Sequence, residues 1–151
     1  MTAVEAARLL LLIPECRDRV QRVIAAMGAR GFGVYVGQTL RTHAEQLDAQ
    51  ARGTTSVHQD RSWHELGRAA DLRKRFADGS VDETTHDEAF FRALWEEARA
   101  VGLRSLAFHD DGSKLLIHTT HGDVWDAGHV EFREPFATLA DAFAAEGEKT
   151  A

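Results

Sequence analysis

Residues 62–71 read SWHELGRAAD, and this stretch carries two potential metal ligands, His64 and Asp71. Near the C-terminus, residues 126–129 read DAGH and add a second imidazole, that of His129. A catalytic zinc site takes three protein ligands and leaves a position for water. Two histidine nitrogens and one carboxylate oxygen therefore form a candidate metal site, provided that the two segments meet in space.

Four further polar residues have candidate roles in such a site. Asp126 lies three residues before His129, and a carboxylate there can act as the general base that a metal-activated water needs. Arg41 follows the first expected strand, where a guanidinium can clamp a substrate carboxylate or stabilise an oxyanion. Ser62 and Glu131 are candidates for outer groups that orient the ligands, and Glu131 shares a strand face with His129.

Spacing alone leaves other interpretations open, because the chain has 8 histidines and 24 acidic residues. Arg41 taken alone is more typical of a surface charge or an ion-pair partner. Trp63 and Trp125 are more typical of core or cleft walls than of reactive groups. His118 and His121 have a spacing that can ligate a metal, but on a hairpin they are more typical of solvated residues. The other histidines have no partner that the sequence identifies and are interpreted as surface residues: His43, His58, His86 and His109.

Length and composition limit the class of protein. The 151 residues, 44% of them hydrophobic, predict one domain over 1–151 with one core and a frayed tail at 146–151. The net charge of −6 argues against a nucleic-acid partner and against a basic patch that adheres to membranes. Cys16 is the one cysteine, which excludes an intramolecular disulfide and a cysteine-based zinc site, and we expect it in the core.

The N-terminal segment does not have the pattern of a signal peptide. Its apolar stretch, 9–13, is short, follows an acidic residue and no basic one, and precedes Pro14. The stretch is also too short to span a membrane. We therefore expect synthesis in the cytoplasm without a signal peptide, so that any action outside the cytoplasm needs another route of release.

The hydrophobic pattern alternates between helix and strand signals. Apolar residues at helical spacing predict helices over about 14–30, 42–52, 91–101 and 136–143. Strand signals occur at 33–38, 68–73, 103–108, 114–119, 124–125 and 129–132, and the third and fourth flank a turn at 110–112. Polar stretches at 53–63 and 76–85 are interpreted as loops. This order predicts an α+β domain with a small, mostly antiparallel sheet flanked by helices.

At the candidate site the chain resembles the VanY-like zinc peptidases of peptidase family M15. These include D-alanyl-D-alanine carboxypeptidases, D-alanyl-D-alanine dipeptidases, and L-alanyl-D-glutamate endopeptidases of phage and bacterial origin. The family pattern is Ser-x-His-x-x-Gly-x-Ala-x-Asp followed by a distal acid-x-x-His. Residues 62–71 and 126–129 are in register with it, and 40–46 is similar to the arginine-bearing segment of the endopeptidase branch. The match covers about residues 33–75 and 122–134.

The resemblance implies a role for each matching residue. His64, Asp71 and His129 would hold one zinc ion per chain. Asp126 would activate water and later protonate the leaving amine, and Arg41 would bind substrate or stabilise the transition state. The resemblance also implies the small α+β fold that these peptidases share with the hedgehog signalling domain.

The implied function is hydrolysis of peptide bonds in peptidoglycan stem peptides. The distal acid is Asp where many relatives have Glu, and Leu40 replaces a Tyr of many carboxypeptidases; both favour the endopeptidase branch. We therefore expect a monomeric L-alanyl-D-glutamate endopeptidase of the phage endolysin type, released to the cell wall by a holin. A D-alanyl-D-alanine carboxypeptidase is the alternative enzyme, and a non-catalytic, zinc-containing cell-wall binding module is the alternative of another class.

Overall fold

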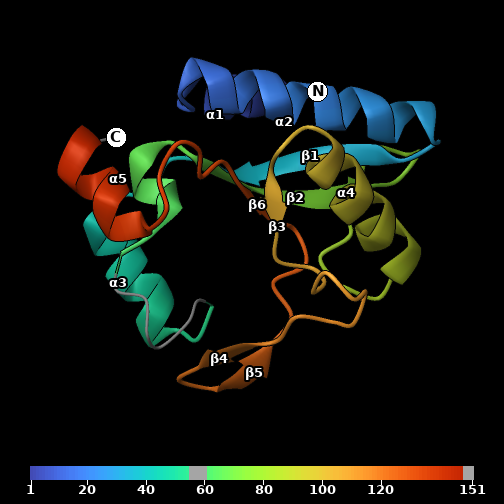
Figure 1. Ribbon diagram of the computed structural model, residues 1–151. Coiled ribbons are helices and arrows are strands. Elements are labelled where there is room, and N and C mark those ends of the chain that lie inside the picture. The colour runs from blue at the N-terminus through green and yellow to red at the C-terminus, as the bar shows by residue number, and fades with distance from the viewer. Residues whose placement is uncertain (55–60, 148–151) are drawn as a thin grey trace.

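The computed structural model describes residues 1–54 and 61–147 (Figure 1). His58 and most of the predicted loop at 53–63 lie outside the described residues, as does 148–151 of the predicted tail. Residue 146 belongs to the last helix. No helix within the described ranges combines the length and the apolar character that crossing a membrane requires.

A four-stranded antiparallel sheet organises the fold. Its order is β1-β2-β6-β3, with bounds Gly33–Gln38, Ala69–Arg75, His129–Glu131 and Arg104–Ser105. A separate pair, β4 (Ile117–Thr119) and β5 (Gly122–Val124), forms a hairpin that projects away from this sheet in Figure 1. The ladder between β2 and β6 places Asp71 directly opposite His129. Strand pairing thus brings together two segments that are far apart in the sequence.

Helices cover the sheet on one side and surround its end. The first two, α1 (Ala3–Leu10) and α2 (Pro14–Ala29), lie along β1, and α4 (Glu88–Ala100) packs against α2 and β3. The remaining helical elements gather at the other end of the molecule in Figure 1: α3 (His43–Ala51), the 3₁₀ turn η1 (Trp63–Leu66) and α5 (Leu139–Glu146). The result is the predicted α+β architecture.

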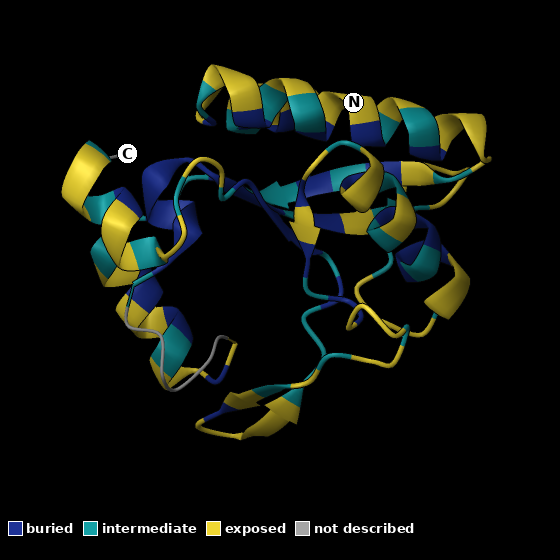
Figure 2. Ribbon diagram, viewed as in Figure 1, coloured by how far each residue is buried: buried dark blue, intermediate teal, exposed yellow. Residues whose placement is uncertain are grey.

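Burial follows the amphipathic patterns of the elements. Figure 2 shows η1 as buried, whereas α1 and α2 have exposed outer faces. The main core joins α2, α4 and the sheet and includes Cys16, as expected for a lone thiol. A second cluster joins Trp63 and Leu66 of η1 to Ala142 of α5. The turn that carries His64 is therefore fixed by apolar contacts with α5.

Three predicted elements differ from the structure. The helix predicted from 136 begins at Leu139, because the Thr138 hydroxyl caps it. The hairpin predicted from 103–108 and 114–119 is reduced to a bridge between Phe108 and Lys114. Its two arms have other partners: 104–105 pairs with β6, and 117–119 pairs with β5.

The first helix, α1, has no counterpart among the predicted elements. A capping box marks its start: the Thr2 hydroxyl accepts a hydrogen bond from the Glu5 N–H, and the Glu5 carboxylate accepts one from the Thr2 N–H. Glu5 is also fully buried, because its carboxylate accepts the Val36 N–H of β1 at 3.0 Å and pairs with Arg75 of β2. Burial raises the pKa of Glu5, but these hydrogen bonds outweigh it and lower the pKa to about 2.

We expect Glu5→Gln to lower the free energy of unfolding by about 3 kcal/mol at pH 7. The folded pKa lies below the unfolded value of 4.5, so the stabilisation is present above pH 4.5 and is lost as the pH falls toward 2. Urea titrations of both proteins at pH 7, 4 and 2.5 measure this. A difference between them that stays constant across this range would show that the charge of Glu5 does not stabilise the fold.

Candidate metal centre and cleft

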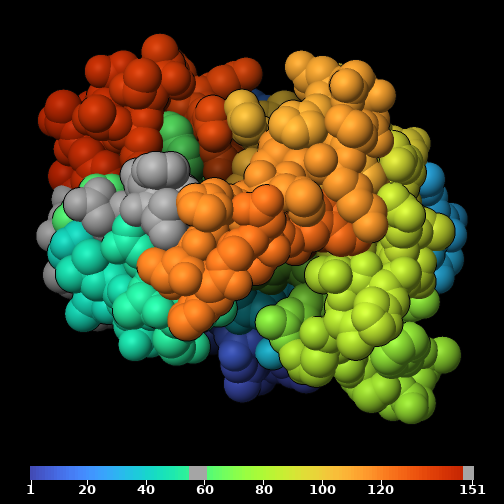
Figure 3. All heavy atoms as spheres, turned by 90° about the horizontal axis from the view of Figure 1, so that it is seen from below, coloured from blue at the N-terminus to red at the C-terminus, as the bar shows by residue number. Residues whose placement is uncertain are grey.

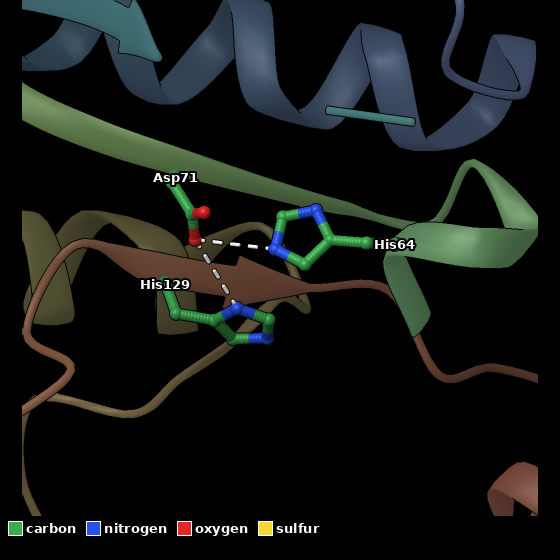
Figure 4. A group of neighbouring side chains, drawn as sticks. All are labelled: His64, Asp71 and His129. Atoms are coloured by element: carbon green, nitrogen blue, oxygen red, sulfur yellow. Dashed lines mark hydrogen bonds and ion pairs between the residues drawn. The ribbon is translucent and has the colours of Figure 1, made fainter. Parts of the chain in front are cut away.

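Three side chains from η1, β2 and β6 converge on one point, as Figure 4 shows. One ligand atom from each of His64, Asp71 and His129 lies within 4.8 Å of the others. Oδ1 of Asp71 is 3.2 Å from Nε2 of His64 and 3.4 Å from Nδ1 of His129. The two segments that the sequence singles out thus meet in space, with two nitrogens and one oxygen directed at a common centre.

The position of His64 follows from the local structure of η1. Ser62 caps the turn, and its Oγ accepts the backbone N–H of His64 at 3.1 Å. Gly67 ends the turn with φ +67°, a conformation that side chains disfavour. Nδ1 of His64 donates to the Thr39 carbonyl at 2.6 Å, because a carbonyl only accepts. The Nε2 that faces Asp71 therefore keeps its lone pair, the tautomer that a metal ligand needs.

His129 is oriented by a carboxylate on its own strand. Its Nε2 donates to Oε1 of Glu131 at 2.8 Å, and Glu131 is buried and paired with Arg133. A histidine held in this way presents its other nitrogen, Nδ1, to the centre. Glu131 thus lies where the sequence predicts an orienting group. Ser62 contacts the backbone of His64 and not its ring, so its contribution to orientation is indirect.

The charges around the centre favour a cation. Burial raises the pKa of Asp71, but the two imidazoles lower it well below its ordinary value. Burial lowers the pKa of His129, but hydrogen bonds to Asp71 and Glu131 outweigh it and raise the pKa to about 10. Carboxylates thus lie on both sides of the His129 imidazole, and the N, N, O donor set is one that zinc accepts.

Asp126 lies next to the converging ligands. Its Oδ2 is 4.0 Å from Nδ1 of His129, and it lines the same small cavity as His64 and Asp71. Burial, opposed by nearby cationic groups and reinforced by the charge of Asp71, raises the pKa of Asp126 to about 6. A carboxyl group with this pKa takes up and releases a proton near neutral pH, as general acid–base chemistry requires.

Arg41 is held rigidly beside Asp71. Its Nη2 lies 3.7 Å from Oδ2 of Asp71, and its guanidinium donates to the amide oxygens of Gln38 and Gln46 at 2.5–3.1 Å. The residue is buried, which excludes the interpretation as a surface charge. The interpretation as an ion-pair partner is confirmed, and the pair with Asp71 places the guanidinium at the centre.

Two connected hollows surround the ligands. A cavity of about 40 Å³ lies at His64, Asp71 and His129, and a groove of about 430 Å³ extends from it. Arg41, Asp71 and Asp126 line both, so the groove leads to the candidate metal position. A cavity of 40 Å³ has room for a metal ion and a water molecule.

The β4–β5 hairpin lies against α3, as Figure 3 shows from below. At its tip, Thr120 Oγ1 donates to the Gln50 carbonyl at 3.1 Å, and Nε2 of His121 donates to the Ala51 carbonyl at 3.2 Å. His118 and His121 are both exposed, as the sequence predicts for solvated residues. His121 nevertheless has a structural role, because it supplies a donor to the end of α3.

Sequence reasoning missed the partner of one histidine. His43 is interpreted from the sequence as an unpaired surface residue, but its Nδ1 lies 3.2 Å from the fully buried Glu65 of η1. Arg61 also pairs with Glu65, at 3.0 Å. The i,i+4 spacing of Arg61 and Glu65 was an available signal. The contact with His43 depends on how α3 packs and had no signal in the sequence.

Comparisons with known proteins identify the fold. No protein-family model and no curated protein matches the sequence. Among solved structures, the L-Ala D-Glu endopeptidase ChiX of Serratia marcescens superposes with a TM-score of 0.58 at 22% identity, over 94% of this chain and 92% of that one. A variant of the vancomycin resistance D,D-pentapeptidase VanY in complex with Zn(II) superposes with a TM-score of 0.54 at 16% identity, over 80% and 72%.

A third match is VanYB in complex with D-alanine-D-alanine, with a TM-score of 0.53 at 18% identity, over 80% of this chain and 71% of that one. At 16 to 22% identity these likenesses establish the fold. It is the α+β fold that the resemblance in residues 62–71 and 126–129 implies.

Proposed function

We propose that this chain is a zinc-dependent peptidase that cleaves the stem peptides of peptidoglycan. The observation that carries the proposal is the convergence of His64, Asp71 and His129 at the end of a groove, with Asp126 beside them. Support comes from solved structures of the same fold: the L-Ala D-Glu endopeptidase ChiX, the VanY variant in complex with Zn(II), and VanYB in complex with D-alanine-D-alanine. The donor set fits one zinc ion per chain and leaves a position for water.

In this proposal each residue of the site has a distinct task. A bound zinc ion would supply Lewis acidity to water and to the scissile carbonyl. The Asp126 carboxylate accepts the proton of the attacking water and later donates it to the leaving amine. The Arg41 guanidinium, fixed by Gln38 and Gln46, donates to the oxygen on which negative charge develops.

The favoured bond is L-alanyl-D-glutamate. The superposition on the endopeptidase ChiX spans nearly all of both chains and supports this choice. The alternative, a D-alanyl-D-alanine carboxypeptidase, is supported by the match to VanYB with its bound dipeptide. A non-catalytic binding module needs no further carboxylate beside the metal ligands, whereas Asp126 lies 4.0 Å from His129 in the same cavity, which favours an enzyme. An endolysin-type enzyme released by a phage holin is the form of this proposal that the resemblance favours.

One experiment tests the activity and identifies the bond. Purified, zinc-loaded protein is incubated with peptidoglycan, with and without a chelator, and the products are analysed by mass spectrometry. We expect new amino groups that the chelator suppresses and that added zinc restores. An N-terminal D-glutamate in the fragments identifies the endopeptidase, and released D-alanine identifies the carboxypeptidase. Absence of chelator-sensitive products would contradict the proposal.

We expect Arg41→Met to fold and to bind zinc but to lose about a hundredfold or more in kcat, because a charged donor at the developing oxyanion is removed. Methionine keeps an apolar stem in the buried site. Arg52→Met serves as a control, because Arg52 lines the same groove but is exposed and pairs with Asp48. If Arg41→Met were unfolded at 25 °C, the role of Arg41 would be that of a structural ion pair.

A further inference from the structure

The groove outside the metal centre has an excess of positive charge. Three arginines line the groove: Arg41 lies at the centre beside Asp71, whereas Arg52 and Arg73 lie outside it, although the whole chain has a net charge of −6. Three acids also line it, but two of them, Asp71 and Asp126, belong to the proposed metal chemistry. Glu83 is the one acidic residue that remains in the outer part of the lining. Such a groove attracts an anionic group of a ligand.

Arg73 has the position from which a side chain can reach a substrate bound at the centre. It follows Asp71 by two residues on β2, so both side chains lie on the same face of the sheet, about 7 Å apart along the strand. Its partner across the ladder is Tyr35 of β1, which also lines the groove. Arg73 is thus the first cationic side chain after the ligand Asp71 on the face of β2 that lines the groove.

The contacts of Arg73 leave its guanidinium available. Among the described residues its ion-pair partner is Glu83, and the two side chains are 47% and 71% exposed. An exposed ion pair of this kind contributes little to stability, so a ligand carboxylate can replace Glu83 at small cost. Arg41 differs, because two glutamines hold its buried guanidinium. Arg52 pairs with Asp48 one turn earlier and lies at the end of α3.

We propose that Arg73 determines specificity by binding a free carboxylate on the substrate residue that follows the scissile bond. This inference rests on the proposed function and names the class of peptide that the site accepts. A guanidinium binds a carboxylate through two parallel hydrogen bonds, which a neutral amide cannot reproduce. The stem-peptide D-glutamate is linked through its γ-carboxyl group, so its α-carboxylate is free. The carboxylate of a terminal D-alanine has the corresponding position.

The test uses matched peptides that differ only in this group. One has L-alanyl-γ-linked D-glutamate with a free α-carboxylate, and the other has the α-amide. We expect the wild type to prefer the carboxylate by roughly ten- to a hundredfold in kcat/KM, the range that a charge-assisted hydrogen bond supports. Arg73→Met should reduce the preference to within twofold by raising KM for the carboxylate peptide, with kcat nearly unchanged. Arg73→Lys should restore part of it.

Two further variants separate this effect from a general loss of charge. Arg52→Met removes a cation from the same groove and should leave the preference unchanged. Glu83→Gln removes the competing carboxylate and should lower KM for the free-carboxylate peptide. A preference that persists in Arg73→Met, or one that Arg52→Met abolishes equally, would overturn the assignment.

A binding experiment distinguishes failure of this inference from failure of the proposed function. Calorimetry with zinc-loaded Asp126→Asn measures the affinity for both peptides without turnover, in the presence and absence of the Arg73→Met change. The same measurement with D-alanyl-D-alanine and its C-terminal amide covers the alternative bond. If the wild type cleaves neither substrate, the proposed function fails. If cleavage occurs, but in both peptide pairs the free-carboxylate peptide and its amide bind with equal affinity, the proposed role of Arg73 is wrong.

Discussion

Replacing Asp126 with alanine is expected to abolish cleavage of peptidoglycan while the zinc content stays near one per chain. Asp126 stands 4.0 Å from Nδ1 of His129, whereas the three converging ligands are complete without it. Its removal takes away the group that accepts the proton from water and returns it to the leaving amine. Loss of a general acid–base group lowers the rate by about 10²- to 10⁴-fold. Release of soluble fragments and elemental analysis of zinc measure the two quantities.

Two controls make this result specific. Asp126→Asn keeps the shape of the side chain and should lose as much rate as the alanine variant. Asp123→Ala removes an exposed acid of the neighbouring hairpin, which pairs with His118, and should retain wild-type activity. If Asp126→Ala kept its activity, the base would be another carboxylate, and the buried Glu131 beside His129 would be the first candidate.

The sequence predicted the elements whose signals are local. The capping box of Thr42 and Glu45 starts α3 where the spacing indicates, and the alternation at 68–73 predicts β2. The same alternation puts Asp71 and Arg73 on one face of β2. The spacing of residues in the sequence could not show that β2 pairs with β6, or that Asp71 lies opposite His129 in this pair. Only the resemblance to known peptidases indicated that these two segments meet.

Contacts between distant segments account for what was missed. The hairpin predicted at 103–119 has a correct turn, in which His109 N–H bonds to the Ser113 carbonyl, but β6 offers its first arm a longer ladder partner inside the sheet. The Thr39 carbonyl fixes the tautomer of His64 from 25 residues away, and no residue type signals a backbone carbonyl. The link between His43 and Glu65 likewise depends on the packing of α3 against η1.

His64→Ala is expected to lose the metal, and cleavage with it. The substitution removes one of the two nitrogen donors and leaves the Thr39 carbonyl without its partner. Changes to groups that only orient a ligand cost about 10- to 100-fold in metal affinity, so loss of a ligand itself should cost more than about a hundredfold. Zinc content after dialysis against a weak chelator measures this directly, and we expect well under one zinc per chain.

Thermal unfolding gives a second readout of the same prediction that does not depend on activity. Zinc binds the folded chain, so saturating zinc should raise the Tm of the wild type. The Tm of His64→Ala should barely respond to zinc, because the remaining imidazole and carboxylate bind it weakly. His109→Ala removes an exposed histidine that is not one of the proposed ligands, so zinc should raise its Tm as much as that of the wild type. If folded His64→Ala still bound one zinc ion per chain, His64 would not be a ligand. The proposed three-ligand centre would then be wrong.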